Sequence, residues 1–318
     1  MAVRIINGDC RTVLATLPDE SVHCCITSPP YFNLRNYQVA GQIGLEDTPD
    51  AYIAEMVAVF REVRRVLRSD GTLWLNIGDS YAQSEIRHRN KESASSGLAN
   101  SQGDWSRNVA QVGRKLNHGL KPKDLIGIPW MLAFALRADG WWLRQDIIWA
   151  KPNPMPESVT DRCTKAHEYL FLLTKSARYH YDAEAIAEDA NTFGRQNTNG
   201  LSPKAVAKQE LGHFSTKTGL VDPYAYESRN RRSVWTIATQ PFREAHFATF
   251  PPALVEPCIK AGCPAGGAVL DPFGGAGTVG LVADRLQRDA VLIELNPAYA
   301  DMARERVTGD APLFAVAE

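Results

Sequence analysis

The amino-acid sequence predicts an α/β fold, with a mostly parallel sheet, helices on both of its faces and one inserted region. First, short apolar runs typical of buried strands alternate with segments whose apolar residues recur at helical spacing. Second, a glycine-rich turn between a strand and a helix lies near the C-terminal end, over residues 271–280. Third, the alternation stops between residues 176 and 240, where polar residues, Gly and Asn dominate.

The N-terminal part begins with a short strand that ends at a Gly-Asp turn. A later strand stops at Pro29 and Pro30, which cannot continue a sheet ladder. A long helical stripe follows, with Thr48 or Asp50 as its N-cap and Gly71 as its end. The expected elements are a strand over residues 3–10, a helix over 11–19, a strand over 21–28, a helix over 48–71 and a strand over 72–79.

The remaining elements continue the alternation on both sides of the inserted region. Residues 82–120 are rich in Ser, Asn and Gly and are too long for a simple connection, so we expect a mobile loop. The expected elements after it are a helix over 127–140, strands over 142–151 and 168–176, a helix over 251–262, a strand over 267–273, a helix over 277–287, a strand over 290–296 and a helix over 297–307.

Two stretches far apart in the sequence therefore form the main domain. We expect this domain to comprise residues 1–175 and 241–318, with a mobile loop over 82–123, and an insertion over 176–240 to interrupt it.

The bulk composition is that of a folded protein outside the membrane. The 318 residues have a formal net charge of −1, and no apolar run reaches the ~18 residues of a membrane span. The N-terminus lacks the apolar segment of an export signal, so we expect a cytoplasmic protein. The six cysteines lack paired metal spacing, which predicts reduced thiols and no metal site.

Positive charge is concentrated in two loop-like segments of this neutral chain. Residues 82–123 and 190–240 each contain more Lys and Arg than Asp and Glu. Such segments suit a polyanion, although ordinary solvated loops have the same composition.

The glycine-rich turn predicts a nucleotide-like cofactor. Gly275, Gly277 and Gly280 have G-x-G-x-x-G spacing between a strand and a helix, and Glu294 ends the next strand. Alone, this motif fits NAD, another nucleoside cofactor or a tight turn without a ligand. Asp271, directly before the glycines, would repel a pyrophosphate but could receive the ammonium group of S-adenosylmethionine.

The position of this turn in the chain also argues against a dinucleotide fold. Only 38 residues follow Gly280, too few for the remaining strands of such a fold. The rest of the sheet must come from earlier in the chain, which indicates circular permutation.

Short motifs occur in a fixed order along nearly the whole chain. They are NGDC, TSPPY, TLWLNIGDS, IIWAKPNPMP, HEYLFLL, HFATFPPALVEPCI, DPFGGAGTVG and LIELNP. In this order the motifs resemble those of the β-class DNA amino-methyltransferases, which methylate N4 of cytosine or N6 of adenine. The resemblance implies a circularly permuted, Rossmann-like fold that uses S-adenosylmethionine, and a target-recognition role for the 176–240 insertion.

The resemblance assigns the chemistry to TSPPY. An aromatic amine is a poor nucleophile, and it gains positive charge and must lose a proton as it attacks a methyl group. Acceptors aimed at its N–H bonds therefore favour the transition state. The resemblance implies that Ser28 Oγ and the Pro29 carbonyl are these acceptors, that Pro30 helps to fix them, and that Tyr31 stacks on a flipped-out base.

The resemblance also implies a cofactor site. Asp9 and Cys10 would lie near the adenine, Glu294 would bind the ribose, and Phe250 would flank the methionine portion. The residues expected around the methionine end are Asp271, Pro272, Phe273, Gly275, Gly277 and Thr278. Lys151, in the segment WAKPN, has no assigned role.

The expected substrate is double-stranded DNA. Serine at position 28 favours cytosine N4, with adenine N6 as the alternative, because aspartate is more usual in the adenine enzymes. The candidate DNA contacts are Arg87, Arg89, Arg107, Arg114, Lys115, Arg229, Arg231 and Arg232. A homodimer is plausible, since family members often pair through their catalytic domains.

Three other functions compete with DNA methylation. One is an NAD-linked oxidoreductase, a second is a DNA-binding protein without activity, and a third is methylation of RNA or of a protein amide. Asp271 and the permuted order disfavour the first, and the complete TSPPY motif disfavours the second.

Overall fold

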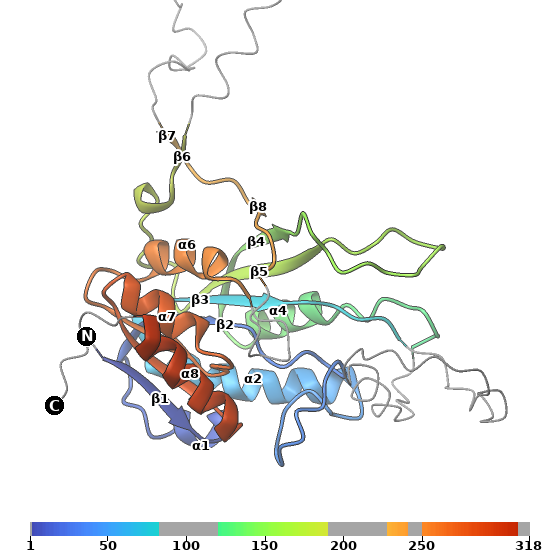
Figure 1. Cartoon of the computed structure of the whole chain (residues 1–318), viewed down its shortest axis with the longest axis horizontal. Coiled ribbons are helices and arrows are strands. Elements are labelled where there is room, and N and C mark those ends of the chain that lie inside the picture. Colours follow the sequence, from blue (N-terminus) through green and yellow to red (C-terminus); the bar gives the residue numbers. More distant parts are fainter. Residues whose placement is uncertain (1, 83–119, 190–227, 241–249, 311–318) are drawn as a thin grey trace, which may run out of the picture. The chain divides into compact units, whose positions relative to one another are not determined.

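The computed structural model describes residues 2–82, 120–189, 228–240 and 250–310 (Figure 1). Its contacts divide the chain into two compact units. One comprises Met1–Tyr181 with Val234–Glu318, and the other is Asp182–Ser233. The second unit lies within the insertion expected over 176–240, but β8 (Val234–Thr236) joins the sheet of the first. The recognition role of the insertion stays a prediction.

A single mixed sheet runs through the first unit. Among the described residues its strand order is β1 (Val3–Asn7), β10 (Asp289–Glu294), β9 (Ala268–Asp271), β2 (Val22–Thr27), β3 (Leu67–Ile77), β5 (His167–Thr174), β4 (Trp142–Ala150) and β8. Neighbouring strands are parallel, except that β5 is antiparallel to β3 and β4. The reversal follows because no helical crossover separates β4 from β5, as a parallel connection would require.

The helices form two groups. In one group α2 (Pro49–Val66) contacts both α1 (Cys10–Leu14) and α4 (Ile128–Ala138), and in the other α7 (Thr278–Arg285) contacts both α6 (Pro252–Gly262) and α8 (Pro297–Asp310). Figure 1 shows α2 and α6 on opposite sides of the central strands. Residues 71–77 of β3 are buried without alternation, as expected for a strand covered on both faces.

Helix α2 begins where the sequence predicts and ends earlier. The Thr48 side chain accepts a hydrogen bond from Ala51 N at 3.1 Å, so Thr48 is the N-cap. The prediction that this helix runs to Gly71 is wrong. The buried Leu67 already has an extended ψ of 139° and opens β3, which contains Gly71.

The ends of the chain meet in this sheet. Strand β1 pairs with β10, and β9 pairs with β2 through Cys24 beside Val269 and Cys25 beside Leu270. Because β9 and β2 are parallel, their carboxyl ends open at one edge, where ligands bind in α/β sheets. The permuted order is therefore present in the structure.

The second unit is small. It contains a 3-10 helix, η1 (Glu184–Ile186), and a two-stranded antiparallel ladder of β6 (Glu188–Asp189) and β7 (Ser228–Arg229). None of the helices in the described part of the chain is long and apolar enough to cross a membrane.

Candidate active site

The strands that carry the two principal motifs end side by side. Thr27 is the last residue of β2, and Asp271 is the last residue of β9. The Thr27 hydroxyl donates to Asp271 Oδ1 at 2.7 Å, and both side chains are buried. This bond ties the proline corner (residues 28–31) to the glycine turn (residues 271–280) across 244 residues of sequence.

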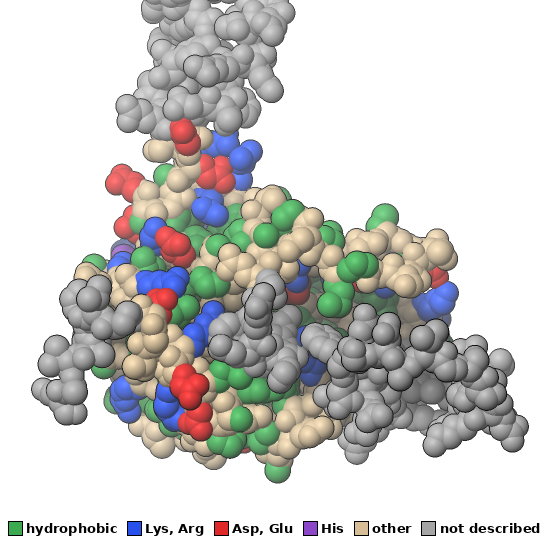
Figure 2. Space-filling view, in the orientation of Figure 1, with side chains coloured by type: hydrophobic (Ala, Val, Ile, Leu, Met, Phe, Trp, Pro, Cys, Tyr) green, Lys and Arg blue, Asp and Glu red, His purple; other side chains and the backbone are tan. Residues whose placement is uncertain are grey.

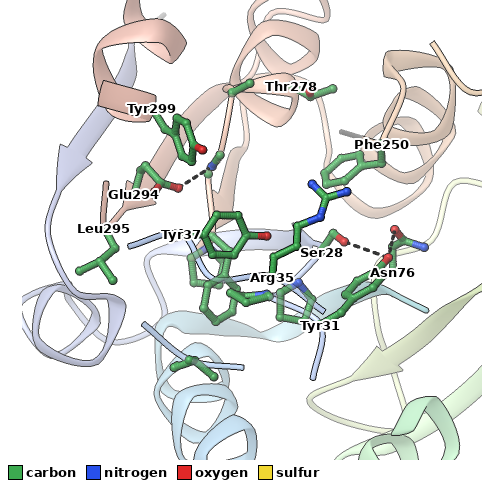
Figure 3. A pocket seen from close by; sticks show the side chains of 18 of the residues that line it. Ser28, Tyr31, Arg35, Tyr37, Asn76, Phe250, Thr278, Glu294, Leu295 and Tyr299 are labelled. Atoms are coloured by element: carbon green, nitrogen blue, oxygen red, sulfur yellow. Dashed lines mark hydrogen bonds between the residues drawn. The ribbon is translucent and has the colours of Figure 1, made fainter. Parts of the chain in front are cut away.

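One cavity of about 720 Å³ joins these motifs (Figure 3). Its lining includes Ser28, Pro29, Pro30 and Tyr31 from the corner and Pro272, Phe273, Gly275 and Thr278 from the turn. Asp9, Cys10, Phe250 and Glu294 also line it. Ser28 and Gly275 therefore open into a shared cavity, as the chemistry inferred from the sequence requires.

The proline corner leaves two oxygen atoms available. The Pro30 carbonyl accepts a hydrogen bond from the buried Tyr52 hydroxyl at 2.9 Å, which fixes the backbone of the corner. No hydrogen bond to the Pro29 carbonyl occurs among the described residues. Ser28 Oγ donates to the Tyr31 hydroxyl at 3.4 Å and keeps its lone pairs for the cavity.

The Tyr31 ring is held at both ends. Its hydroxyl donates to Glu168 Oε2 at 2.7 Å and lies 3.3 Å from Asn76 Oδ1. Gly78 lies so close that an added Cβ atom would be 2.6 Å from Tyr31 Cε2. These contacts give the ring a defined position in the cavity.

An ion pair forms the wall behind Tyr31. Glu168, on β5, pairs with the ammonium group of Lys151, which follows β4, and both side chains are only 17% exposed. The same ammonium lies 4.2 Å from the Trp149 ring centroid. Glu168 and Asn76 were not predicted as site residues, because strand pairing brings them to Tyr31. Strand β2 pairs with β3, which carries Asn76, and β3 pairs with β5, which carries Glu168.

Glu294 lies at the far end of the cavity from Tyr31 (Figure 3). Its Oε2 accepts from Gly275 N and its Oε1 from Asn296 N, each at 2.8 Å. Burial raises the pKa of this carboxyl above its ordinary value, although both backbone donors lower it. The carboxylate is therefore fixed against the glycine turn with lone pairs left for hydroxyl groups.

Asp271 is buried beneath the turn instead of lining the cavity. Its Oδ1 accepts from Phe273 N at 3.0 Å as well as from Thr27. Burial raises the pKa of its carboxyl to about 7, and Glu294 adds to this increase. A direct contact between Asp271 and a cofactor stays a prediction. The structure shows that Asp271 supports the backbone of the turn.

The glycine turn has positive φ angles at Gly275 (50°) and Gly277 (77°), which favour glycine. Gly277 is outside the cavity lining, and a Cβ atom there would be 2.8 Å from Ala303 Cβ on α8. Thr278 lines the cavity, and its hydroxyl accepts from Arg306 at 3.0 Å. Gly277 thus allows α8 to approach the turn, while Gly275 lines the cavity.

The end of the cavity near β1 is partly aromatic. The Tyr37 and Tyr299 rings both line it and meet edge to face at 6.4 Å, and neither was predicted. The Arg11 guanidinium, 2.5 Å from Asp9 Oδ2, lowers the pKa of the Asp9 carboxyl. Burial raises the pKa of the Cys10 thiol to about 12, so this thiol stays neutral.

The candidate DNA contacts fall into two groups. Arg87, Arg89, Arg107, Arg114 and Lys115 lie outside the described residues. In the second unit, Arg229 and Arg232 both pair with Glu188, at 3.4 and 2.9 Å. On the visible face of the first unit, acidic and basic side chains are interspersed (Figure 2).

Comparisons with known proteins agree with this geometry. Residues 22–305 match the model of the DNA methylase family that groups N6 and N4 methyltransferases. The chain is 46% identical to the Type II methyltransferase M.SmaI of Serratia marcescens, over 96% of this chain and 90% of that protein. It is 45% identical to the Type II methyltransferase M.Cfr9I of Citrobacter freundii, over 96% and 88%.

Solved structures show the same fold. A protein named as a DNA modification methylase from Thermus thermophilus, complexed with S-adenosyl-L-methionine, matches with a TM-score of 0.59 and 25% identity, over 98% of this chain and 96% of that one. The cytosine-N4-specific PvuII DNA methyltransferase matches with a TM-score of 0.61 and 17% identity, over 97% and 90%.

Proposed function

We propose that this chain, which belongs to the N6/N4 DNA methylase family, methylates the N4 amino group of cytosine in double-stranded DNA, using S-adenosylmethionine. The observation that carries the proposal is the shared cavity, which has the proline corner on one side and the glycine turn on the other. Family membership also argues against an NAD-linked oxidoreductase.

The residues of the cavity fit S-adenosylmethionine. Gly275 lets a ligand approach the backbone closely, and Glu294 offers acceptor lone pairs beside it, suited to ribose hydroxyls. Tyr37, Tyr299 and Phe250 provide apolar surface for the adenine and for the methionine chain. When bound, S-adenosylmethionine supplies an electrophilic methyl group on a sulfonium.

The proline corner suits an amine. Ser28 Oγ and the Pro29 carbonyl have unused lone pairs, and the Tyr52 hydroxyl holds the Pro30 carbonyl so that the corner stays rigid. Acceptors at fixed positions stabilise the charge that grows on the amine during attack and add no reorganisation cost. Ser28 Oγ and the Pro29 carbonyl are uncharged, so they stabilise the amine through hydrogen bonds from its N–H groups.

The cavity suits a base that has left the duplex. Tyr31, whose ring is fixed by Glu168 and Gly78, provides a stacking surface. Leu34 and Met155, which also line the cavity, are 46% and 75% exposed. Such apolar side chains can occupy the gap that an extruded base leaves in the stack.

Ser28 is the reason for choosing cytosine over adenine. The enzymes that this sequence resembles more usually have serine at this position when they methylate cytosine N4, and aspartate when they methylate adenine N6. The second unit and the 82–123 loop would read and hold the DNA. By analogy with the Type II relatives, the methylation would be specific for one sequence and would belong to a restriction-modification pair.

The proposal is tested by sequencing and nucleoside mass spectrometry of DNA from cells that produce the protein, with Ser28→Ala as the inactive control. We expect N4-methylcytosine at one recognition sequence with the wild type and none with the variant. N6-methyladenine instead would contradict the choice of base. Unmodified DNA from an intact, S-adenosylmethionine-binding protein would contradict the function.

A further inference from the structure

Glu168 is an acidic side chain of the cavity that lies outside the TSPPY motif. A chain of hydrogen bonds connects it to the catalytic corner: Ser28 Oγ donates to the Tyr31 hydroxyl at 3.4 Å, which donates to Glu168 Oε2 at 2.7 Å. The first bond is long, but catalytic hydrogen bonds are often long before substrate binds.

The direction of this chain is fixed by its last member. The Glu168 carboxylate can only accept, and it is a stronger acceptor for the single Tyr31 proton than Asn76 Oδ1, which lies 3.3 Å away. The Asn76 amide donates to the same Glu168 oxygen at 3.2 Å. Tyr31 therefore accepts from Ser28, and the remaining lone pairs of Ser28 face the cavity.

Tyr31 keeps its proton in the resting protein. Burial, together with the neighbouring Glu168 charge, raises the pKa of the Tyr31 hydroxyl well above its ordinary value. Tyr31 therefore works as a donor and passes a proton only when it receives one.

We propose that Glu168 is the final acceptor of the proton that the exocyclic amine loses, with Tyr31 and Ser28 as the relay. This step rests on the proposed function only in requiring an exocyclic amine as substrate. The amine lone pair forms the new N–C bond, and the electron pair of the broken C–S bond stays on sulfur. The amine proton moves to Ser28 Oγ as the Ser28 proton moves to Tyr31 and the Tyr31 proton to Glu168 Oε2. A neutral Glu168 acid results, which later releases the proton to water.

The ion pair with Lys151 offsets the cost of burying the Glu168 carboxylate. Its ammonium pairs with Glu168 Oε1, opposite the oxygen that faces Tyr31, and lies on the Trp149 ring. The charges of Lys151 and Glu168 cancel, so this proton acceptor adds no net charge to the cavity. Glu168 acts on the substrate through Tyr31 and Ser28 and is therefore a positioning residue.

The test compares Glu168→Gln with Tyr31→Phe in single-turnover methylation of saturating DNA. Glutamine can still accept from the Tyr31 hydroxyl but is a very weak base, whereas phenylalanine keeps the ring and breaks the relay. We expect both variants to lose about 100-fold or more in rate, the scale of general acid–base catalysis. S-adenosylmethionine affinity, measured by calorimetry, should stay within about twofold of wild type.

Three further variants keep the test decisive. The double variant Lys151→Gln/Glu168→Gln replaces the ion pair by two neutral amides. It serves as a test if Lys151 without its partner disturbs folding in Glu168→Gln. Its single-turnover rate should be as low as that of Glu168→Gln. Two control variants should have the wild-type single-turnover rate. Glu256→Gln removes a surface partner of Lys260, and Tyr179→Phe removes a surface hydrogen bond.

Wild-type rates in a folded Glu168→Gln or in the double variant would overturn the relay, even if Tyr31→Phe were slow. The rates are compared on whichever base the wild type methylates. A finding of adenine instead of cytosine would therefore overturn the choice of base and leave this comparison intact.

Discussion

Replacing Gly78 by alanine tests the position of the Tyr31 ring without substituting a residue that lines the cavity. The added Cβ would lie 2.6 Å from Tyr31 Cε2 and 3.2 Å from Cδ2, whereas ordinary contacts of this kind begin at 3.4 Å. The ring must therefore retreat by roughly 0.8 Å, the difference between 3.4 and 2.6 Å. Gly78 has no positive φ, so the new methyl group adds no backbone strain.

The retreat has a calculable consequence. The Tyr31 hydroxyl is tethered to Glu168 at 2.7 Å, so a shift of this size weakens or breaks that hydrogen bond. Overpacking of this kind costs about 1–3 kcal/mol of stability. A misplacement of about 1 Å in a catalytic site can lower the rate about 100-fold. We therefore expect Gly78→Ala to methylate DNA about 10- to 100-fold more slowly in single turnovers.

Cofactor affinity separates this effect from general damage. Glu294 and the glycine turn lie at the other end of the cavity, so calorimetry should give an S-adenosylmethionine affinity close to wild type (Figure 3). Gly309→Ala on α8 is the matched control, because a Cβ there meets no atom within 4 Å. A Gly78→Ala protein with the wild-type rate, or with equal losses of rate and cofactor affinity, would refute the reasoning.

Three other substitutions have defined outcomes. Tyr31→Ala should lower the single-turnover rate far more than S-adenosylmethionine affinity, and an unchanged rate at saturating DNA would remove the stacking role. Glu294→Gln turns an N–H donor toward Gly275 N or Asn296 N. By calorimetry it should weaken S-adenosylmethionine binding about 10- to 100-fold, or about 1.4–2.8 kcal/mol, and unchanged affinity would contradict the ribose role. Asp271→Asn keeps an acceptor for Thr27 and Phe273. The pKa of Asp271 rises from 3.8 to about 7 on folding, so the folded wild type binds the extra proton and loses stability as the pH rises through this window. Without cofactor, the free energy of unfolding of the variant, measured in urea, should rise relative to wild type by up to roughly 4 kcal/mol between pH 4 and pH 8. This follows from a pKa difference of about three units at 1.36 kcal/mol each. If the free energies of unfolding of wild type and Asp271→Asn changed with pH in parallel, the burial of the Asp271 charge would be contradicted.

The sequence could predict the fold because its signals are local. Apolar periodicity marked α2, and Thr48 caps it, but the end of α2 was missed because Leu67 continues both the helical stripe and the following strand. The antiparallel direction of β5 was also missed, since strand patterns alone carry no direction.

The site was predictable to the extent that its residues lie in contiguous motifs. The proline corner and the glycine turn each have their own sequence pattern, and both line the cavity. Asn76 comes to Tyr31 through the pairing of β2 with β3, and Glu168 through the pairing of β3 with β5. Asp271 carries a motif signal, yet its burial beneath the turn depends on Thr27 from the other end of the chain.

A crystal structure with S-adenosylhomocysteine and a duplex containing the recognition sequence is the most direct test of methyl transfer within this cavity. We expect the ribose hydroxyls on Glu294, the cofactor sulfur directed toward Ser28, and an extruded cytosine between them whose amino group contacts Ser28 Oγ and the Pro29 carbonyl. A cofactor seated away from Glu294, or a target base bound outside the cavity that Ser28 and Gly275 share, would contradict it.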